Sequence, residues 1–134
     1  MRLLLPVAFC LVASHAAAQA CGDALPASRR SVDGANYVVV YATKPGPIVV
    51  GEHFVVDFAV CPRAGGARPR SVRIDATMPE HRHGMNYRAA VAELAPGRYR
   101  AEGLLFHMPG RWEITFDVVA DGATERLAST LSVE

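Results

Sequence analysis

The chain has 134 residues, of which 51% are hydrophobic, and its 14 basic and 13 acidic side chains leave a formal net charge of +1. A chain of this length is expected to form one domain, and its hydrophobic fraction is ordinary for a globular protein. The near balance of charge, with arginines scattered along the sequence, argues against the basic stripe of a nucleic-acid-binding protein and against an acidic tail.

The first twenty residues are predicted to be a cleaved secretory signal peptide. Arg2 supplies the positive end, residues 3–12 form a short apolar run, and Ala18-Gln19-Ala20 fits the small-x-small rule for cleavage. The apolar run is too short to span a bilayer, and no other segment comes close. We therefore expect a mature chain that begins at Cys21, is periplasmic or secreted, and has no membrane span.

Two cysteines remain after this cleavage, because Cys10 leaves with the signal peptide. An even pair in an oxidising compartment predicts a disulfide between Cys21 and Cys61. Lipid attachment at Cys21 is an alternative, but such sites usually carry Leu or Val three residues before the cysteine, where this chain has Ala18. Copper ligation by Cys61 is another alternative, and the strand topology argued below places that residue at the wrong end for it.

After an irregular leader over residues 21–35, the sequence predicts seven short strands separated by turn residues. The strands are rich in Val, Ile, Tyr and Phe, and most alternate apolar with polar positions, as strands with one face in a core do. The fourth is the weakest, because alanine gives it little strand propensity. The strands are expected at residues 36–43, 53–60, 70–78, 87–95, 98–103, 112–119 and 124–133.

No stretch shows a convincing helical period, and the chain has no internal repeat or low-complexity segment. Seven short strands with turns between them predict an all-β fold, an immunoglobulin-like antiparallel β-sandwich over residues 36–134. Pro96-Gly97 and Asp121-Gly122 mark two of the tight turns. Tyr99 and Trp112 lie on alternating strands, so we expect both to pack in the core.

Two short stretches hold all the methionines of the predicted mature chain and every histidine but one. Residues 78–86 read MPEHRHGMN, and residues 106–110 read FHMPG. Thioether sulfur selects Cu(I), and imidazole binds copper in either oxidation state. The competing interpretation is that Met78 and Met108 end strands and cap the core, with His81 and His83 merely solvated. The candidate metal ligands are His81, His83, Met85, His107, Met108, Met78 and His53.

Strand parity predicts that both stretches lie at the same end of the sandwich. Successive connections between antiparallel strands alternate between the two ends, so the turn at residues 44–51, the loop at 79–86 and the stretch at 107–110 share one end. His53 opens the second strand and belongs to that end too. Cys61 ends a strand at the opposite end, where the leader enters the first strand, so a bridge to Cys21 is reasonable in space.

The chain contains three short motifs in a distinctive order: Met78-Pro79-x-His81-x-His83-Gly84-Met85, then Pro96-Gly97-x-Tyr99, then Gly103-Leu104-x-Phe106-x-Met108-Pro109-Gly110-x-Trp112. Their order and spacing resemble the YtkA-like family, which includes FixH-like proteins, over residues 36–133. The resemblance implies a small exported or membrane-anchored β-sandwich associated with copper handling and with assembly of respiratory oxidases. FixH-like members carry a transmembrane helix, whereas this chain has a cleavable signal.

The sequence thus predicts a periplasmic or exported copper-binding protein that serves as a carrier, a buffer or an accessory in oxidase assembly. Its partner would be a copper-requiring membrane oxidase or a copper transporter. His81 and His83 are two residues apart, so an extended backbone would send both side chains the same way. The alternative is a metal-free immunoglobulin-like module whose loops bind a protein partner.

An enzymatic function is the weakest interpretation. Histidines with Glu80 as a base would suit a zinc hydrolase, but methionine is a poor zinc ligand and adds nothing to hydrolysis. The sequence shows no Ser/His/Asp set, phosphate loop or dinucleotide fingerprint. We therefore expect neither an enzyme nor a nucleic-acid partner.

Overall fold

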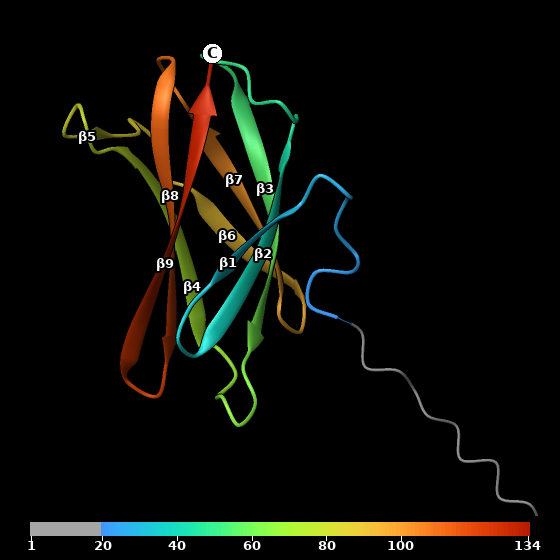
Figure 1. Cartoon of the computed structure of the whole chain (residues 1–134). Coiled ribbons are helices and arrows are strands. Elements are labelled where there is room, and N and C mark those ends of the chain that lie inside the picture. Colours follow the sequence, from blue (N-terminus) through green and yellow to red (C-terminus); the bar gives the residue numbers. More distant parts are fainter. Residues whose placement is uncertain (1–19) are drawn as a thin grey trace, which may run out of the picture.

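The structure is a computed structural model that describes residues 20–134, so the predicted signal peptide, apart from Ala20, lies outside the described residues. Within this part of the chain nine strands form two antiparallel sheets, and no helix is present. The two sheets pack around one apolar core (Figure 1). The prediction of an all-β, immunoglobulin-like sandwich is therefore confirmed.

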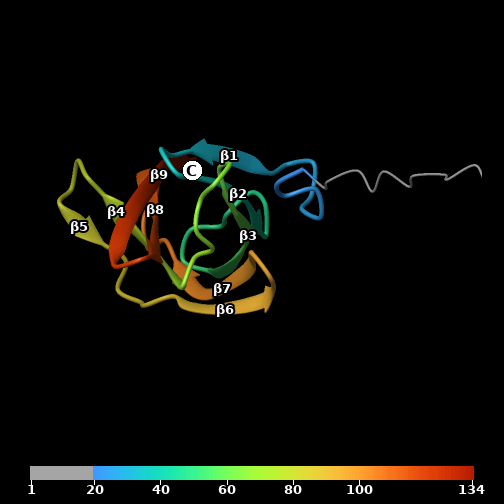
Figure 2. The ribbon, with the colours of Figure 1, turned by 90° about the horizontal axis from the view of Figure 1, so that it is seen from below.

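We call the five-stranded sheet, with the order β1-β2-β3-β7-β6, sheet A, and the four-stranded sheet, with the order β5-β4-β8-β9, sheet B. Figure 2 shows sheet A curving around the molecule from β1 to β6, with sheet B on its other side. The strands are β1 (Arg30–Asp33), β2 (Tyr37–Lys44), β3 (His53–Pro62), β4 (Ser71–Met78), β5 (His83–Gly84), β6 (Ala90–Ala95), β7 (Arg98–Leu105), β8 (Gly110–Ala120) and β9 (Ala123–Val133).

The core is built from alternate residues of the long strands. On β3 the four alternate residues from Phe54 to Val60 are 2% exposed or less, which is the face that the sequence predicted. Phe58 links the two sheets, because its ring stacks on Tyr99 of sheet A at 5.2 Å and lies 5.3 Å from Phe116 of sheet B. Complete burial of a side chain of this kind contributes roughly 1.5–3 kcal/mol.

A bulge in β7 decides which residues at its end face the core. The pairing of β7 with β3 changes register between Val56 opposite Ala101 and Phe54 opposite Leu104. Gly103 lies in this interval with φ 84°, a conformation that glycine adopts without a Cβ clash. The extra residue turns both Leu104 and Phe106 inward, where each is fully buried. The next residue, His107, is exposed.

Two short strands were not predicted from the sequence. β1 lies within the segment that was expected to be an irregular leader, and it pairs with residues 38–41 of β2. β5 lies within the expected loop and pairs with Thr77 and Met78 at the end of β4. The fourth expected strand is shorter than predicted, because β6 begins only at Ala90. The described residues contain no helix that is long and apolar enough to cross a membrane.

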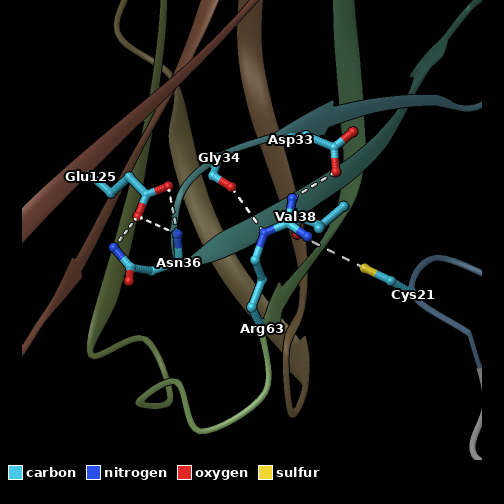
Figure 3. Close-up of polar contacts among 7 residues, drawn as sticks. All are labelled: Cys21, Asp33, Gly34, Asn36, Val38, Arg63 and Glu125. Atoms are coloured by element: carbon cyan, nitrogen blue, oxygen red, sulfur yellow. Dashed lines mark hydrogen bonds and ion pairs between the residues drawn. The ribbon is translucent and has the colours of Figure 1, made fainter.

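The N-terminal segment is tied to sheet A by a disulfide. Cys21 and Cys61 are bonded, with Cα atoms 5.9 Å apart, as the sequence predicted. The Cys21 sulfur also lies 3.9 Å from the Val38 carbonyl oxygen (Figure 3). Because a disulfide sulfur carries no hydrogen, this second contact is packing and not a hydrogen bond.

Polar contacts fix the turn between β1 and β2 next to this disulfide (Figure 3). The Arg63 guanidinium donates to the Gly34 carbonyl at 2.9 Å and to Asp33 at 2.8 Å. The Glu125 carboxylate accepts from the backbone and side-chain amides of Asn36, at 3.0 and 2.8 Å. Since Glu125 belongs to β9, these bonds join sheet A to sheet B along one flank of the sandwich.

Candidate functional site

Three connections meet at the upper end of the sandwich in Figure 1, and we call this end the top end. They are residues 45–52 between β2 and β3, residues 79–89 between β4 and β6, and residues 106–109 between β7 and β8. Both histidine- and methionine-containing stretches are therefore brought to one end, as strand parity predicted. The disulfide lies at the opposite end of β3.

The first stretch is a tight hairpin between β4 and β5. His83 pairs with Met78, and the His81 amide donates to the Met78 carbonyl at 3.0 Å. Arg82, between the two histidines, has φ 55°, which few residues other than glycine adopt. The backbone from His81 to His83 is thus turned, whereas the two-residue spacing had predicted an extended backbone. The two imidazole rings are nevertheless close, with centroids 5.7 Å apart.

His83 lies between the two other histidines of these stretches. Its ring centroid is 5.0 Å from that of His107, in addition to its 5.7 Å separation from His81. We call these three residues the histidine cluster. His81 and His107 are exposed, whereas His83 is half-buried. The cluster therefore has one ring held by the protein surface and two that face solvent.

Trp112 packs against two of the three rings of the histidine cluster. Its ring lies 5.8 Å from His83 and 5.4 Å from His107, both in edge-on geometry. The ring itself is fully buried, stacks on Phe106 at 4.3 Å, and donates its Nε1 hydrogen to the Met108 carbonyl at 3.1 Å. The expected core position of Trp112 is confirmed. The contact of Trp112 with the imidazoles was not predicted, although Trp112 lies only four residues beyond Met108 in the sequence.

The imidazoles of the cluster have the chemistry and the spacing to hold a metal ion between neighbouring rings. His83 Nδ1 lies 3.3 Å from the Gly84 carbonyl oxygen, and a hydrogen bond there would leave Nε2 with its lone pair free for a metal. Ring separations of 5.0 and 5.7 Å permit two rings to share one ion, since metal–nitrogen bonds are about 2 Å long.

The donor atoms do not converge in the arrangement that the structure shows. Over residues 20–134, no three His, Cys, Asp or Glu side chains are grouped closely enough to hold a metal ion. Rotation of the exposed His81 and His107 rings, or donation by a methionine sulfur, would be needed to complete a coordination sphere.

The three candidate methionines differ in burial. Met78 is 1% exposed and belongs to the hydrophobic core, with its terminal methyl beside Gly110. This placement matches the core interpretation of that residue. Met85 and Met108 are half-buried and pack against the edge of the core. They are the two candidate methionines that are partly exposed to solvent.

His53 reaches the top end, but its contacts differ from those of the histidine cluster. It opens β3 in sheet A, opposite Leu105. Its ring lies edge-on against Tyr87 at 5.0 Å, and its Nδ1 is 3.3 Å from the Leu104 carbonyl oxygen. Within the described chain, Tyr87 is thus the aromatic neighbour of His53.

Glu80 forms an ion pair with Arg111 at the start of β8. This pair connects the hairpin that carries His81 and His83 to the strand that carries Trp112. A carboxylate that is engaged by an arginine is a poor general base, so the contact adds nothing to the zinc-hydrolase interpretation. Nothing local in the sequence indicates that Arg111 pairs with Glu80, so Arg111 was not among the predicted site residues.

Comparisons with known proteins agree with this architecture. The family model described as YtkA-like matches residues 31–117. A crystal structure of a DUF4426 family protein from Pseudomonas aeruginosa is similar, with a TM-score of 0.52 and 11% sequence identity, covering 78% of this chain and 94% of that chain. At this identity the likeness shows the fold alone. No curated protein matches the chain.

Proposed function

Because the chain belongs to the YtkA-like family, we propose that it binds a copper ion at its top end and acts outside the cytoplasm. In this proposal it is a carrier, a buffer or an accessory factor in oxidase assembly, as in FixH-like proteins, and it catalyses no reaction. The observation that carries the proposal is the position of His83 between His81 and His107, with ring separations of 5.7 and 5.0 Å.

Copper is the cargo of this site, and each candidate ligand has a separate role. The half-buried His83 would provide the fixed imidazole, because Trp112 lies against it. The exposed His81 and His107 would rotate to meet the ion from either side. Met85 and Met108 would supply soft thioethers, which favour Cu(I), whereas the imidazoles accept both oxidation states. We leave Met78 out because it is buried in the core, and His53 out because its ring packs on Tyr87.

Export is the second part of the proposal. The signal-like N-terminus and the Cys21–Cys61 disulfide are both typical of a protein that leaves the reducing cytosol. A Cys21 sulfur bonded to Cys61 cannot also carry a lipid thioether, which favours the cleaved and unlipidated form. A copper-requiring membrane oxidase or a copper transporter would then be the partner that exchanges the ion.

Trp112 provides a direct test of the copper proposal. It is the only tryptophan in the chain and lies within 6 Å, ring to ring, of His83 and His107. Cu(II) is paramagnetic, so binding at the histidine cluster is expected to quench Trp112 fluorescence with a stoichiometry of one ion per chain. Absence of saturable quenching, together with absence of copper after purification from copper-supplemented cells, would overturn the proposal.

The alternative is a metal-free module whose top end binds a protein partner. One observation favours it: Val49 and Tyr87, both in top-end connections, are 45% and 47% exposed. Large apolar side chains that face solvent are common at interaction surfaces, although single ones are also ordinary on monomers. Capture of a partner that is insensitive to copper and to His83→Ala, but lost on Tyr87→Ser, would support this alternative.

A further inference from the structure

One edge of sheet B is left open along most of β4. β5 covers only Thr77 and Met78, and the Met85 amide adds one bond to the Ala76 carbonyl at 3.2 Å. Backbone N–H and C=O groups of an antiparallel strand point to alternating sides from one residue to the next. Val72 and Ile74 have the same parity as Ala76, so their backbone groups point away from β8. Between residues 20 and 134 no strand pairs with them.

A groove of ≈620 Å³ runs beside this open edge. Val72 and Ile74 line one wall, and Met85, Tyr87 and Val91, from the segment that crosses from β5 to β6, line the other. Tyr87 is 47% exposed, and Met85 and Val91 are half-buried. The groove therefore combines free backbone donors and acceptors with apolar side chains on both walls, which is the combination that binds an extended peptide as an added strand.

The charges at the rim of the groove favour an acidic occupant. Three arginines and two aspartates line it. Asp117 is paired with Arg126, at 2.7 and 2.8 Å. Asp75 accepts from the Ala76 amide at 2.8 Å, a neutral donor that does not cancel its charge, so the groove residues together carry one net positive charge. Arg73 and Arg88 have no ion-pair partner among the described residues. Two guanidinium groups are thus free to bind carboxylates beside the open edge.

We propose that this groove binds an extended acidic segment of a partner protein, which adds to sheet B as a strand next to β4. Its backbone pairs with Val72 and Ile74. Its apolar side chains lie on Met85 and Val91, and its carboxylates bind Arg73 and Arg88. The copper proposal is not needed for this inference, since none of these contacts involves the histidine cluster; Met85, a candidate thioether in the copper proposal, is the one residue that both proposals use.

A synthetic peptide tests the proposal on the intact protein. The probe is a capped hexapeptide that alternates valine and glutamate, because six residues at about 3.4 Å each are enough to span the five residues of β4, 71–75, that are left open. We expect saturable binding, with the largest amide chemical-shift changes in NMR spectra at Val72 and Ile74. Replacement of glutamate by lysine in the peptide should weaken binding at least tenfold. N-methylation of every second peptide amide should abolish binding when the methylated set is the one that faces β4, and should leave binding intact when it is the other set.

Protein variants separate charge recognition from loss of folding. Arg73→Glu with Arg88→Glu should weaken binding of the glutamate peptide at least tenfold and strengthen binding of the lysine peptide. Arg98→Glu, an exposed arginine at the start of β7 and outside the groove, is the matched control and should change neither. Equal binding of both peptides, shift changes away from β4, or concentration-dependent pairing of β4 with a second copy that excludes the peptide would each overturn the proposal.

Discussion

The imidazole rings of His83 and His107 lie 5.0 Å apart, although one residue belongs to β5 in sheet B and the other follows β7 in sheet A. Trp112 contacts both rings from below, at 5.8 and 5.4 Å. The candidate copper site is therefore a junction between the two sheets. Its geometry depends on the packing of the sandwich as well as on the loops that carry the ligands.

The first prediction concerns which histidines bind copper. His83→Ala should lower the affinity for Cu(II) at least tenfold, because it removes the ring that lies between the other two. His53→Ala should change the affinity less than twofold, because the His53 ring packs on Tyr87. Titrations followed by Trp112 fluorescence measure both. A loss with His53→Ala as large as that with His83→Ala would place His53 in the site and contradict this assignment.

The second prediction separates the oxidation states. Met85→Leu with Met108→Leu keeps side-chain volume but removes both half-buried sulfurs, so it should weaken Cu(I) binding more than Cu(II) binding. Competition with a Cu(I)-specific chromophoric chelator measures the difference. Met78→Leu is the matched control: it should leave copper affinity unchanged and cost less than about 1.5 kcal/mol of stability, as volume-conserving core changes usually do. Equal losses for both oxidation states would remove the sulfurs from the site.

The third prediction concerns Asp57, which is 8% exposed on the outer face of sheet A. Arg100 donates to it at 2.6 and 3.0 Å, and Lys44 lies 2.8 Å away. The hydrogen bonds from Arg100 lower the pKa of Asp57 below its ordinary value, desolvation opposes them, and Lys44 lowers the pKa further. The folded-state pKa is thus below the unfolded-state pKa. The resulting stabilisation is present above about pH 4 and is lost as pH falls through the folded-state pKa.

Asp57→Asn should therefore lower the free energy of unfolding at pH 7 by about 1.5–3 kcal/mol, the range for hydrogen bonds to charged groups. The deficit should shrink as pH falls below about 4. Urea unfolding at a series of pH values measures it. Asp33→Asn is the control, because the exposed pair of Asp33 with Arg63 is expected to contribute about 1 kcal/mol or less. A deficit that stays constant down to pH 2 would show that the charge of Asp57 is not the cause.

The fourth prediction concerns the disulfide. Cys21 and Cys61 are separated by 40 residues, and closing a loop of that length contributes roughly 4 kcal/mol in the chain-entropy description. Cys21→Ala with Cys61→Ala should lower the free energy of unfolding by about that amount while leaving copper binding at the top end unchanged. Chemical denaturation and Trp112 fluorescence titration measure the two effects. A large loss of copper affinity would mean that the two ends of the sandwich are coupled.

Several structural features follow from local sequence patterns and were predicted correctly. Alternation along β3 identified the buried face from Phe54 to Val60, and Pro96-Gly97 and Asp121-Gly122 placed two of the turns. The order of strands and turns also placed residues 78–86 and 106–110 at one end. The membership of the candidate metal site was less predictable, because residue type alone does not distinguish Met78 in the core from the half-buried Met108.

The sequence by itself determined the β-sandwich, the disulfide pairing and the meeting of the two histidine-containing stretches. The sandwich and the meeting of the two stretches depend on periodicity and turn residues, which act over a few neighbouring positions. The disulfide pairing follows from the two cysteines that remain after the predicted cleavage. Tertiary structure alone decided that β1 and β5 become strands, because such short segments are ordered only by pairing with β2 and β4. It also decided that His53 packs on Tyr87, that Glu80 pairs with Arg111, and that β4 keeps an open edge. These outcomes depend on contacts between residues distant in sequence, which local patterns do not specify.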